Sequence, residues 1–249
     1  MPPVPSPGAY GVGVAYFWSL SRAGAAVSRV LAERTLPATL EFLDSTCINT
    51  VEDYAGIGLQ RDAGALLIFG QDGDTRTVEA DLERIARICK VEGALEVRVA
   101  GSKLATQSIL EARRAVLPSL SRLAPLTILE DATVPRSRIA EMVDRITEVA
   151  DRHELVIGTF GHAGDGNLHP TCVVDPDQPR ALERVEAAFG EIFAAALDLG
   201  GSVTGEHGVG LAKKKFLVDQ LGESQIALLR RIKAAFDPYA ILNPGKLGS

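Results

Sequence analysis

The sequence predicts a single domain in which strands alternate with helices, and two observations support this. Short apolar runs recur along the chain, separated by segments with the three- and four-residue spacing of amphipathic helices. Hydrophobic residues make up 46% of the 249 residues, which is enough for a buried core. Such an alternation fits either a parallel doubly wound sheet or an α+β layer with antiparallel pairing, as in a ferredoxin-like unit. The pattern alone does not decide between these two folds.

The first elements follow a short arm. Residues 1–10, MPPVPSPGAY, are rich in proline, which is typical of a linker or disordered arm. Strands are then expected where apolar residues gather, at 11–20, 38–44, 64–71 and 94–100. Helices are expected between them at 21–34 and 74–93. In the second of these helices Val78, Leu82 and Ile85 share one face, and Gly93 marks its end.

The second half of the chain continues the alternation. Strands are expected at 126–135 and 155–162. Helices are expected at 102–118, 137–153, 180–201, 211–222 and 223–238. Pro118 sets the expected end of the first helix, and Gly200 and Gly201 stop the third. The lysine run 213–215 falls in the fourth helix, where a solvated face or a domain contact is expected rather than a phosphate site.

Composition narrows the class of protein. The net charge is −6 with both signs mixed along the chain, which argues against a nucleic-acid binder because such a protein needs a basic face. Cys47, Cys89 and Cys172 show no CxxC spacing, which fits reduced thiols in the cytosol. The sequence has no signal peptide and no apolar run of about 18 residues. We therefore expect a cytoplasmic protein, at most peripheral to the inner face of the membrane.

Two of the four histidines lie in one glycine-rich stretch, GHAGDGNLHP at 161–170. Gly164, Asp165 and Gly166 follow an apolar strand and predict a tight turn. His162 precedes this turn and His169 follows it, so the turn can bring the two imidazoles together. The stretch lacks the GxGxxG pattern of a phosphate-binding loop. The alternative is a glycine-rich hairpin whose histidines only satisfy hydrogen bonds.

A second glycine-rich stretch, GSVTGEHGVG at 201–210, carries the adjacent residues Glu206 and His207. Its glycines allow a bound group to approach closely. With His162 and His169, Glu206 completes a set of two imidazoles and one carboxylate. That set suits a divalent metal, zinc or alternatively manganese or iron, with positions open for a substrate. A metal lowers the pKa of a bound hydroxyl, and His207 is left as the base that takes the proton.

An arginine pair offers a third element of the site. Arg113 and Arg114 lie in ILEARRAVLP, and an arginine in a pocket is a natural bidentate partner for a carboxylate. The alternative is a pair of solvent-facing helix arginines, and the spacing does not choose between them.

These motifs together resemble a known family. GHAGDGNLHP, GGSVTGEHGVG and the terminal AAFDPYAILNPGKL are similar to the C-terminal domain of FAD-linked 2-hydroxyacid oxidoreductases, flavoenzymes of the vanillyl-alcohol-oxidase type. That family includes the glycolate oxidase flavoprotein subunit, D-lactate dehydrogenase and D-2-hydroxyglutarate dehydrogenase. ATLEFLD, EARRAVLP and EDATVP also fall in the family's order. The resemblance covers residues 11–249 and implies an α+β domain, an antiparallel ferredoxin-like sheet covered by helices.

The resemblance also implies roles for single residues. His162 and His169 match the family's metal histidines, and Glu206 matches its metal carboxylate. His207 matches the catalytic base. One of the two arginines matches the family's arginine that binds the substrate carboxylate. Counting back from Pro118, Arg113 fits this position better than Arg114.

The implied reaction is oxidation of a D-2-hydroxy acid to a 2-oxo acid with FAD as acceptor. Asn243, in LNPGK, matches a tail that packs near the flavin and is the cofactor-binding residue expected here. The hydroxyglutarate enzymes have a lysine, a threonine and an asparagine where this chain has Leu129, Leu117 and Thr171. Loss of these polar groups favours a short or apolar substrate such as glycolate or D-lactate.

The flavin itself is expected to come from elsewhere. The family binds FAD through an N-terminal domain, and only MPPVPSPGAY precedes Gly11 in this chain. A separate FAD-binding chain or an electron-transfer subunit is therefore an expected partner, and an apolar face left uncovered near the tail would favour a homo-oligomer. The alternative function is a non-catalytic metal- or ligand-binding α+β module, or a truncated remnant without its own activity.

Overall fold

One antiparallel sheet organises the chain, and the computed structural model describes residues 8–246. Its strands are β1 (Ala9–Phe17), β2 (Thr39–Asp44), β3 (Ala65–Gly73), β4 (Glu96–Val99), β5 (Leu126–Leu129), β6 (Ala132–Thr133), β7 (Val156–His162) and β8 (Asn167–Val174). They lie in the order β4-β1-β3-β2-β7-β8-β5, with β6 paired to β8, and each of these pairs is antiparallel. The antiparallel α+β fold is confirmed, and the parallel alternative is wrong.

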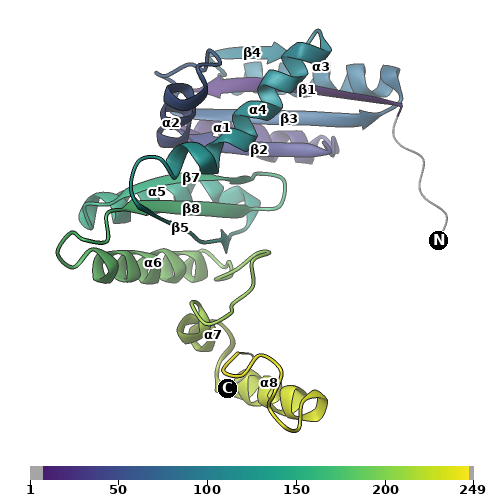
Figure 1. Ribbon diagram of the computed structural model, residues 1–249. Coiled ribbons are helices and arrows are strands. Elements are labelled where there is room, and N and C mark those ends of the chain that lie inside the picture. The colour runs from purple at the N-terminus through teal and green to yellow at the C-terminus, as the bar shows by residue number, and fades with distance from the viewer. Residues whose placement is uncertain (1–7, 247–249) are drawn as a thin grey trace.

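Helices cover both faces of this sheet (Figure 1). The helices are α1 (Leu20–Ala32), α2 (Ser45–Ala55), α3 (Thr75–Val91), α4 (Lys103–Leu120), α5 (Ile139–Arg152), α6 (Ala181–Asp198), α7 (Lys214–Leu221) and α8 (Glu223–Phe236), and those from α1 to α6 cover the sheet. Apolar side chains of α1, α3, α5 and α6 join one core cluster, and those of α2 and α4 join a second. The sheet therefore separates two apolar layers.

Strand β3 shows why its sequence is an unbroken apolar run. Ala65, Leu67 and Phe69 belong to the core under α1 and α3, whereas Leu66 and Ile68 belong to the core under α2 and α4. Successive side chains of a strand point to opposite faces, so a strand covered on both faces needs apolar residues at every position. Burial on both sides makes β3 the centre of the N-terminal half of the sheet.

The pairing of β2 with β7 joins the two halves of the sheet. In this register Glu41 lies opposite His162, and Leu43 lies opposite Phe160. A residue of the ATLEFLD segment is thereby placed beside the first histidine of GHAGDGNLHP, although 121 positions separate them in the chain.

Helix α2 was not expected from the sequence. It begins after Asp44, whose side chain accepts a hydrogen bond of 2.8 Å from the backbone N–H of Cys47, as an N-cap residue does. Its apolar face is narrow, with Cys47, Ile48 and Val51 as the buried hydrophobic residues. Serine, threonine and asparagine have modest helix propensity, so the segment gave only a weak helical pattern.

Several element boundaries also differ from expectation. Helix α4 continues past Pro118 to Leu120, because a proline in the last turn removes only one of the helix hydrogen bonds. The strand expected at 126–135 is divided into β5 and β6 at Asp131, whose side chain bonds to another loop. Strand β1 begins at Ala9, two residues before its expected start at Gly11, and residues 1–7 lie outside the described residues.

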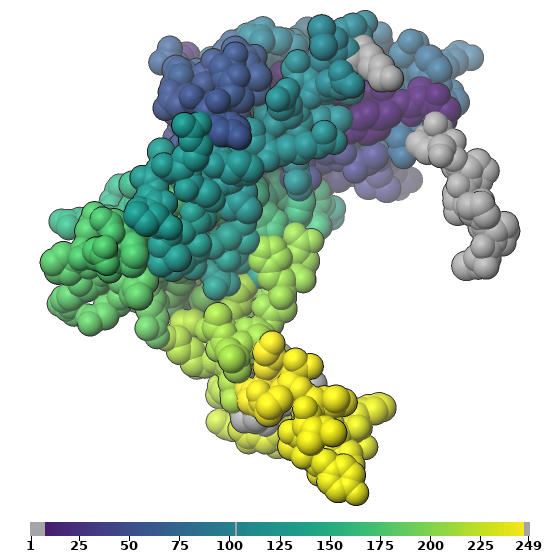
Figure 2. All heavy atoms as spheres, in the orientation of Figure 1, coloured from purple at the N-terminus to yellow at the C-terminus, as the bar shows by residue number. Residues whose placement is uncertain are grey.

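The C-terminal helices stand away from the sheet (Figures 1 and 2). Of the residues in α8, Ile226 is the buried hydrophobic one, whereas Phe236 at its end and Tyr239 after it are 84% and 85% exposed. An uncovered apolar surface of this kind is typical of a contact face. In residues 8–246, every helix falls short of the length and apolarity needed to cross a membrane.

Candidate metal centre

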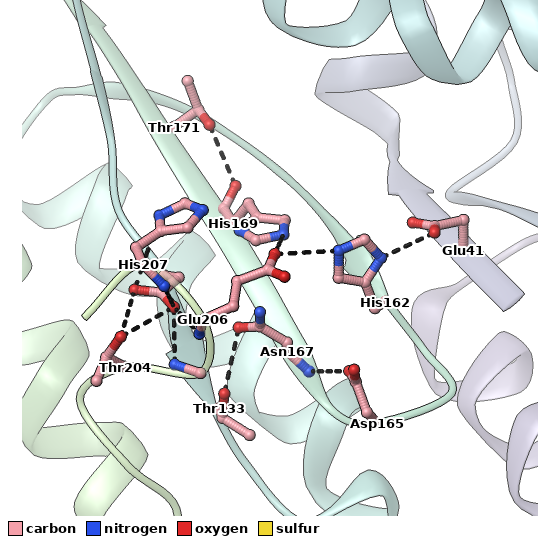
Figure 3. Close-up of polar contacts among 12 residues, drawn as sticks. Glu41, Thr133, His162, Asp165, Asn167, His169, Thr171, Thr204, Glu206 and His207 are labelled. Atoms are coloured by element: carbon pink, nitrogen blue, oxygen red, sulfur yellow. Dashed lines mark hydrogen bonds and ion pairs between the residues drawn. The ribbon is translucent and has the colours of Figure 1, made fainter. Parts of the chain in front are cut away.

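A β-hairpin brings the two histidines of GHAGDGNLHP together (Figure 3). His169 of β8 lies opposite Phe160, which is two residues before His162 on β7, so both imidazoles project from the same face of the hairpin. Their ring centroids are 5.1 Å apart and the rings are nearly perpendicular. Gly166 closes the turn with φ of 87°, and a Cβ there would lie 2.1 Å from the carbonyl oxygen of Val134. The turn predicted from the sequence is present.

Glu206 approaches the pair from the loop after α6. Its Oε1 lies 3.2 Å from Nε2 of His162 and 3.3 Å from Nε2 of His169. The three ligand atoms all lie within 4.8 Å of one another. Ligands that lie about 2.0–2.1 Å from a tetrahedral zinc are separated by about 3.3 Å. The donor set and its spacing therefore fit a divalent ion.

A buried carboxylate orients His162 from the opposite side. Glu41 Oε1 lies 2.8 Å from Nδ1 of His162, and its side chain is 12% exposed. This hydrogen bond is the main reason why the pKa of His162 is raised, although burial of the ring opposes it. A neutral ring that donates Nδ1–H to Glu41 leaves the lone pair of Nε2 directed at Glu206. Carboxylate–histidine pairs of this kind commonly support metal ligands.

His169 is held in the neutral form by its surroundings. Burial first, and then the charges of the neighbouring His162 and His207, lower the pKa of this imidazole to about 4. Its Nδ1 is buried and has no hydrogen-bond partner among residues 8–246. A metal binds imidazole in its neutral form, so an imidazole that resists protonation suits a ligand position.

His207 lies beside the three candidate ligands without joining them. Its ring stacks on that of His169, with centroids 5.0 Å apart and an angle of 13° between the planes. The side chain is 38% exposed, so part of the imidazole is accessible to a bound molecule. Its Nδ1 is 3.8 Å from Oδ1 of Asp131. This position suits a group that exchanges a proton with a substrate next to the metal.

The structure separates the two arginines of α4. Arg113 lies near the site, because its guanidinium is 3.5 Å from the carboxylate of Glu41 and its charge acts on His162. Arg114 is exposed and forms no ion pair within the described part of the chain. The choice of Arg113 over Arg114 remains a prediction, and this geometry agrees with it.

Asn243 is not brought to the histidine site. It lies in the exposed segment after α8 with φ of 47°, and no hydrogen bond joins it to the site in the described residues.

The lysine run 213–215 differs from expectation at its first residue. Lys213 is 2% exposed, so the expectation of a solvated face is wrong at this position. Its ammonium bonds to the buried carboxylate of Asp131.

The sequence did not point to three residues that support the site: Glu41 and Asp131, which contact it, and Lys213, which contacts Asp131. Glu41 and Asp131 each interrupt an apolar strand pattern, in ATLEFLD and LTILEDATVP, and an acidic residue in such a place is a usable signal. Asp131 is fully buried, and burial alone would raise its pKa. Hydrogen bonds from Lys213 and from backbone N–H groups outweigh burial and hold the pKa well below the usual range.

Comparison with known proteins identifies the family. The family model described as "FAD linked oxidases, C-terminal domain" matches residues 7–247. The chain belongs to this family. Among curated FAD-linked relatives, the glycolate oxidase subunit GlcD of Bacillus subtilis is 49% identical over 98% of the chain, and that of Escherichia coli K12 is 33% identical over 98%. A D-lactate dehydrogenase of Anaerostipes hadrus is 29% identical over 90%.

This FAD-linked oxidase domain spans about half the length of the relatives that it matches. It covers 52% of the Bacillus subtilis protein and 49% of the other two. Solved structures share the fold at low identity. A 4-ethylphenol oxidase from Gulosibacter chungangensis aligns with a TM-score of 0.70 at 15% identity, covering 98% of this chain and 54% of its own. A p-cresol methylhydroxylase aligns with a TM-score of 0.66 at 15% identity, covering 97% and 53%.

Proposed function

We propose that this domain forms the substrate- and metal-binding part of an FAD-dependent enzyme that oxidises a D-2-hydroxy acid, of the glycolate or D-lactate type, to the 2-oxo acid. The observation that carries the proposal is the convergence of His162 Nε2, His169 Nε2 and Glu206 Oε1 beside the partly exposed ring of His207. Relatives named glycolate oxidase subunit and D-lactate dehydrogenase support the substrate class.

Two bound groups complete the chemistry. A divalent ion, zinc or alternatively manganese or iron, would be held by His162, His169 and Glu206 and would act as a Lewis acid toward substrate oxygens. FAD, when bound, accepts the two electrons that leave the substrate carbon. The donor set fits such an ion. The partial exposure of His207 supports access to the site by a substrate and by a flavin carried outside residues 8–246.

Residues of this chain would bind the substrate, take its proton and orient the metal ligand. The guanidinium of Arg113 would pair with the substrate carboxylate, since a planar fork of donors matches two carboxylate oxygens. The imidazole of His207 would take the proton of the substrate hydroxyl as the carbon–oxygen double bond forms. Asp131 lies 3.8 Å from Nδ1 of His207 and would stabilise the imidazolium that results. Glu41 would hold His162 in the tautomer that a metal ligand requires.

The substrate preference rests on three positions at which the related hydroxyglutarate enzymes carry polar side chains. Thr171 is fully buried, and its hydroxyl donates a hydrogen bond of 3.2 Å to the carbonyl of His169, so it is not free to hold a second substrate carboxylate. Leu117 and Leu129 offer no polar group either. We therefore infer a monocarboxylic hydroxy acid. The role of Asn243 near the flavin and the cytoplasmic location remain predictions from the sequence.

Turnover by the complete flavin-loaded protein that contains this chain tests the proposal. The reduction of an artificial electron acceptor would be followed with glycolate, D-lactate, L-lactate and D-2-hydroxyglutarate. Glycolate or D-lactate should be oxidised, a chelator should abolish the activity, and added zinc or manganese should restore it. Metal binding without any flavin reduction across the panel would instead identify a non-catalytic metal-binding module. Activity that is indifferent to chelation would overturn the metal role.

A further inference from the structure

The loop that presents Glu206 and His207 is organised around one buried carboxylate. Oδ2 of Asp131 accepts hydrogen bonds from three consecutive backbone N–H groups, those of Gly205 at 2.7 Å, Glu206 at 2.8 Å and His207 at 3.1 Å. The hydroxyl of Thr204 donates to the same side chain at 3.1 Å. The loop therefore wraps an anion, as successive N–H groups do in backbone nests.

That carboxylate is itself fixed in place. Asp131 is fully buried, and the ammonium of Lys213 bonds to its side chain and, at 2.7 Å, to its backbone carbonyl. Lys213 also lies 3.1 Å from the carboxylate of Glu130. A buried charge without a partner is strongly destabilising, and Lys213 provides the compensating charge. The anion at the centre of the loop is thus held by a lysine 82 positions away in the chain.

The same segment also supports the histidine hairpin. Two residues after Asp131, Thr133 of β6 pairs with Asn167 of β8, and both of its backbone groups bond to Ser202 at 3.0 and 2.8 Å. The segment that begins at Asp131 therefore lies between the strand that carries His169 and the loop that carries Glu206. Ligands from two distant parts of the sequence are aligned through it (Figure 3).

We propose that Asp131, compensated by Lys213, is a positioning residue that shapes the loop of Glu206 and His207 for metal binding. The inference rests on the proposed metal function of the site. Asp131 touches neither the metal position nor the substrate position. Besides the stabilisation of the His207 imidazolium proposed above, it fixes the three peptide groups from which the ligand Glu206 and the base His207 project.

Two double variants test this role at equal net charge. In D131L/K213M, both buried charges are replaced by apolar groups and the loop N–H groups lose their acceptor. In D131N/K213M, the charges are also gone but an amide oxygen remains as acceptor. We expect D131L/K213M to bind Zn²⁺ or Mn²⁺ about 10- to 100-fold more weakly than D131N/K213M, the range seen when outer partners of metal ligands are changed. Thermal unfolding of the metal-free proteins reports stability separately.

Equal metal affinity in the two variants would overturn the proposal, and so would a loss of affinity that only follows a loss of folded protein. Amide hydrogen exchange of the metal-free natural protein gives a second test that needs no variant. The N–H groups of Gly205, Glu206 and His207 should be protected although these residues are exposed. Rapid exchange there would refute the positioning role. A natural protein with protected amides that binds neither ion would refute the metal function alone.

Discussion

Changing Glu41 to glutamine tests how the buried carboxylate supports the metal site. The carboxylate contacts Nδ1 of His162 at 2.8 Å and is 12% exposed, so solvent screens the contact little. A hydrogen bond to a charged group contributes roughly 1.5–3 kcal/mol, and one between neutral groups roughly 0.5–1.5 kcal/mol. The difference is about 1–1.5 kcal/mol, which corresponds to about a tenfold loss of metal affinity for E41Q at neutral pH.

The same variant should also change the pH dependence of metal binding, and the pH midpoint should move to a lower value. Glu41 raises the pKa of His162 above its ordinary value of 6.5, so the proton competes with the metal at a higher pH than at an unperturbed histidine. Metal binding by the natural protein should therefore weaken as the pH falls through this raised pKa. In E41Q the pKa of His162 falls, and the midpoint of the binding curve should move to lower pH.

Calorimetric titration with Zn²⁺ between pH 5.5 and 8 measures both effects. A matched control is E191Q, because Glu191 makes an equivalent contact of 2.8 Å with Nε2 of His153 outside the site. E191Q should leave the affinity and the pH midpoint unchanged. If E41Q bound zinc like the natural protein and with the same midpoint, Glu41 would have no role in preparing His162.

Other changes probe the remaining residues. H207A should keep the metal but lower kcat of the flavin-loaded protein by about 100-fold or more, the usual contribution of a general base, and near-normal turnover would exclude that role. R113K should raise KM for the hydroxy acid through loss of the bidentate contact, as steady-state kinetics would reveal, and an unchanged KM would place the substrate carboxylate elsewhere. F69A should lower the free energy of unfolding by about 3–5 kcal/mol, because Phe69 is fully buried. Urea denaturation measures this, and a loss below about 1 kcal/mol would contradict the central place of β3.

Local patterns in the sequence predicted most of the elements but not their arrangement. The spacing of Val78, Leu82 and Ile85 was sufficient for α3, because an amphipathic helix leaves a periodic trace. Whether strands pair parallel or antiparallel cannot be predicted from such local periodicity, since it depends on contacts between distant segments such as β2 and β7. Helix α2 was missed because its narrow apolar face, around Ile48 and Val51, is set among residues of modest helix propensity.

The candidate site, too, could be predicted only in part from the sequence. His162 and His169 could be placed together from sequence because one short turn joins them, and the turn residues are visible in GHAGDGNLHP. Asp131 and Lys213 could not be paired, since they lie 82 positions apart and form no motif. A lysine in a run of three usually faces solvent, and only the buried partner explains why Lys213 does not.

The most direct test of the central claim is the metal content of the protein purified from its own cells, measured by mass spectrometry for the natural chain, H162A, H169A and the control H153A. His153 lies outside the site and bonds to Glu191. The natural chain and H153A should carry about one divalent ion per chain, and H162A and H169A should lose most of it. Equal metal content in all four proteins, or none in the natural chain, would contradict the assignment of His162, His169 and Glu206 as a metal centre.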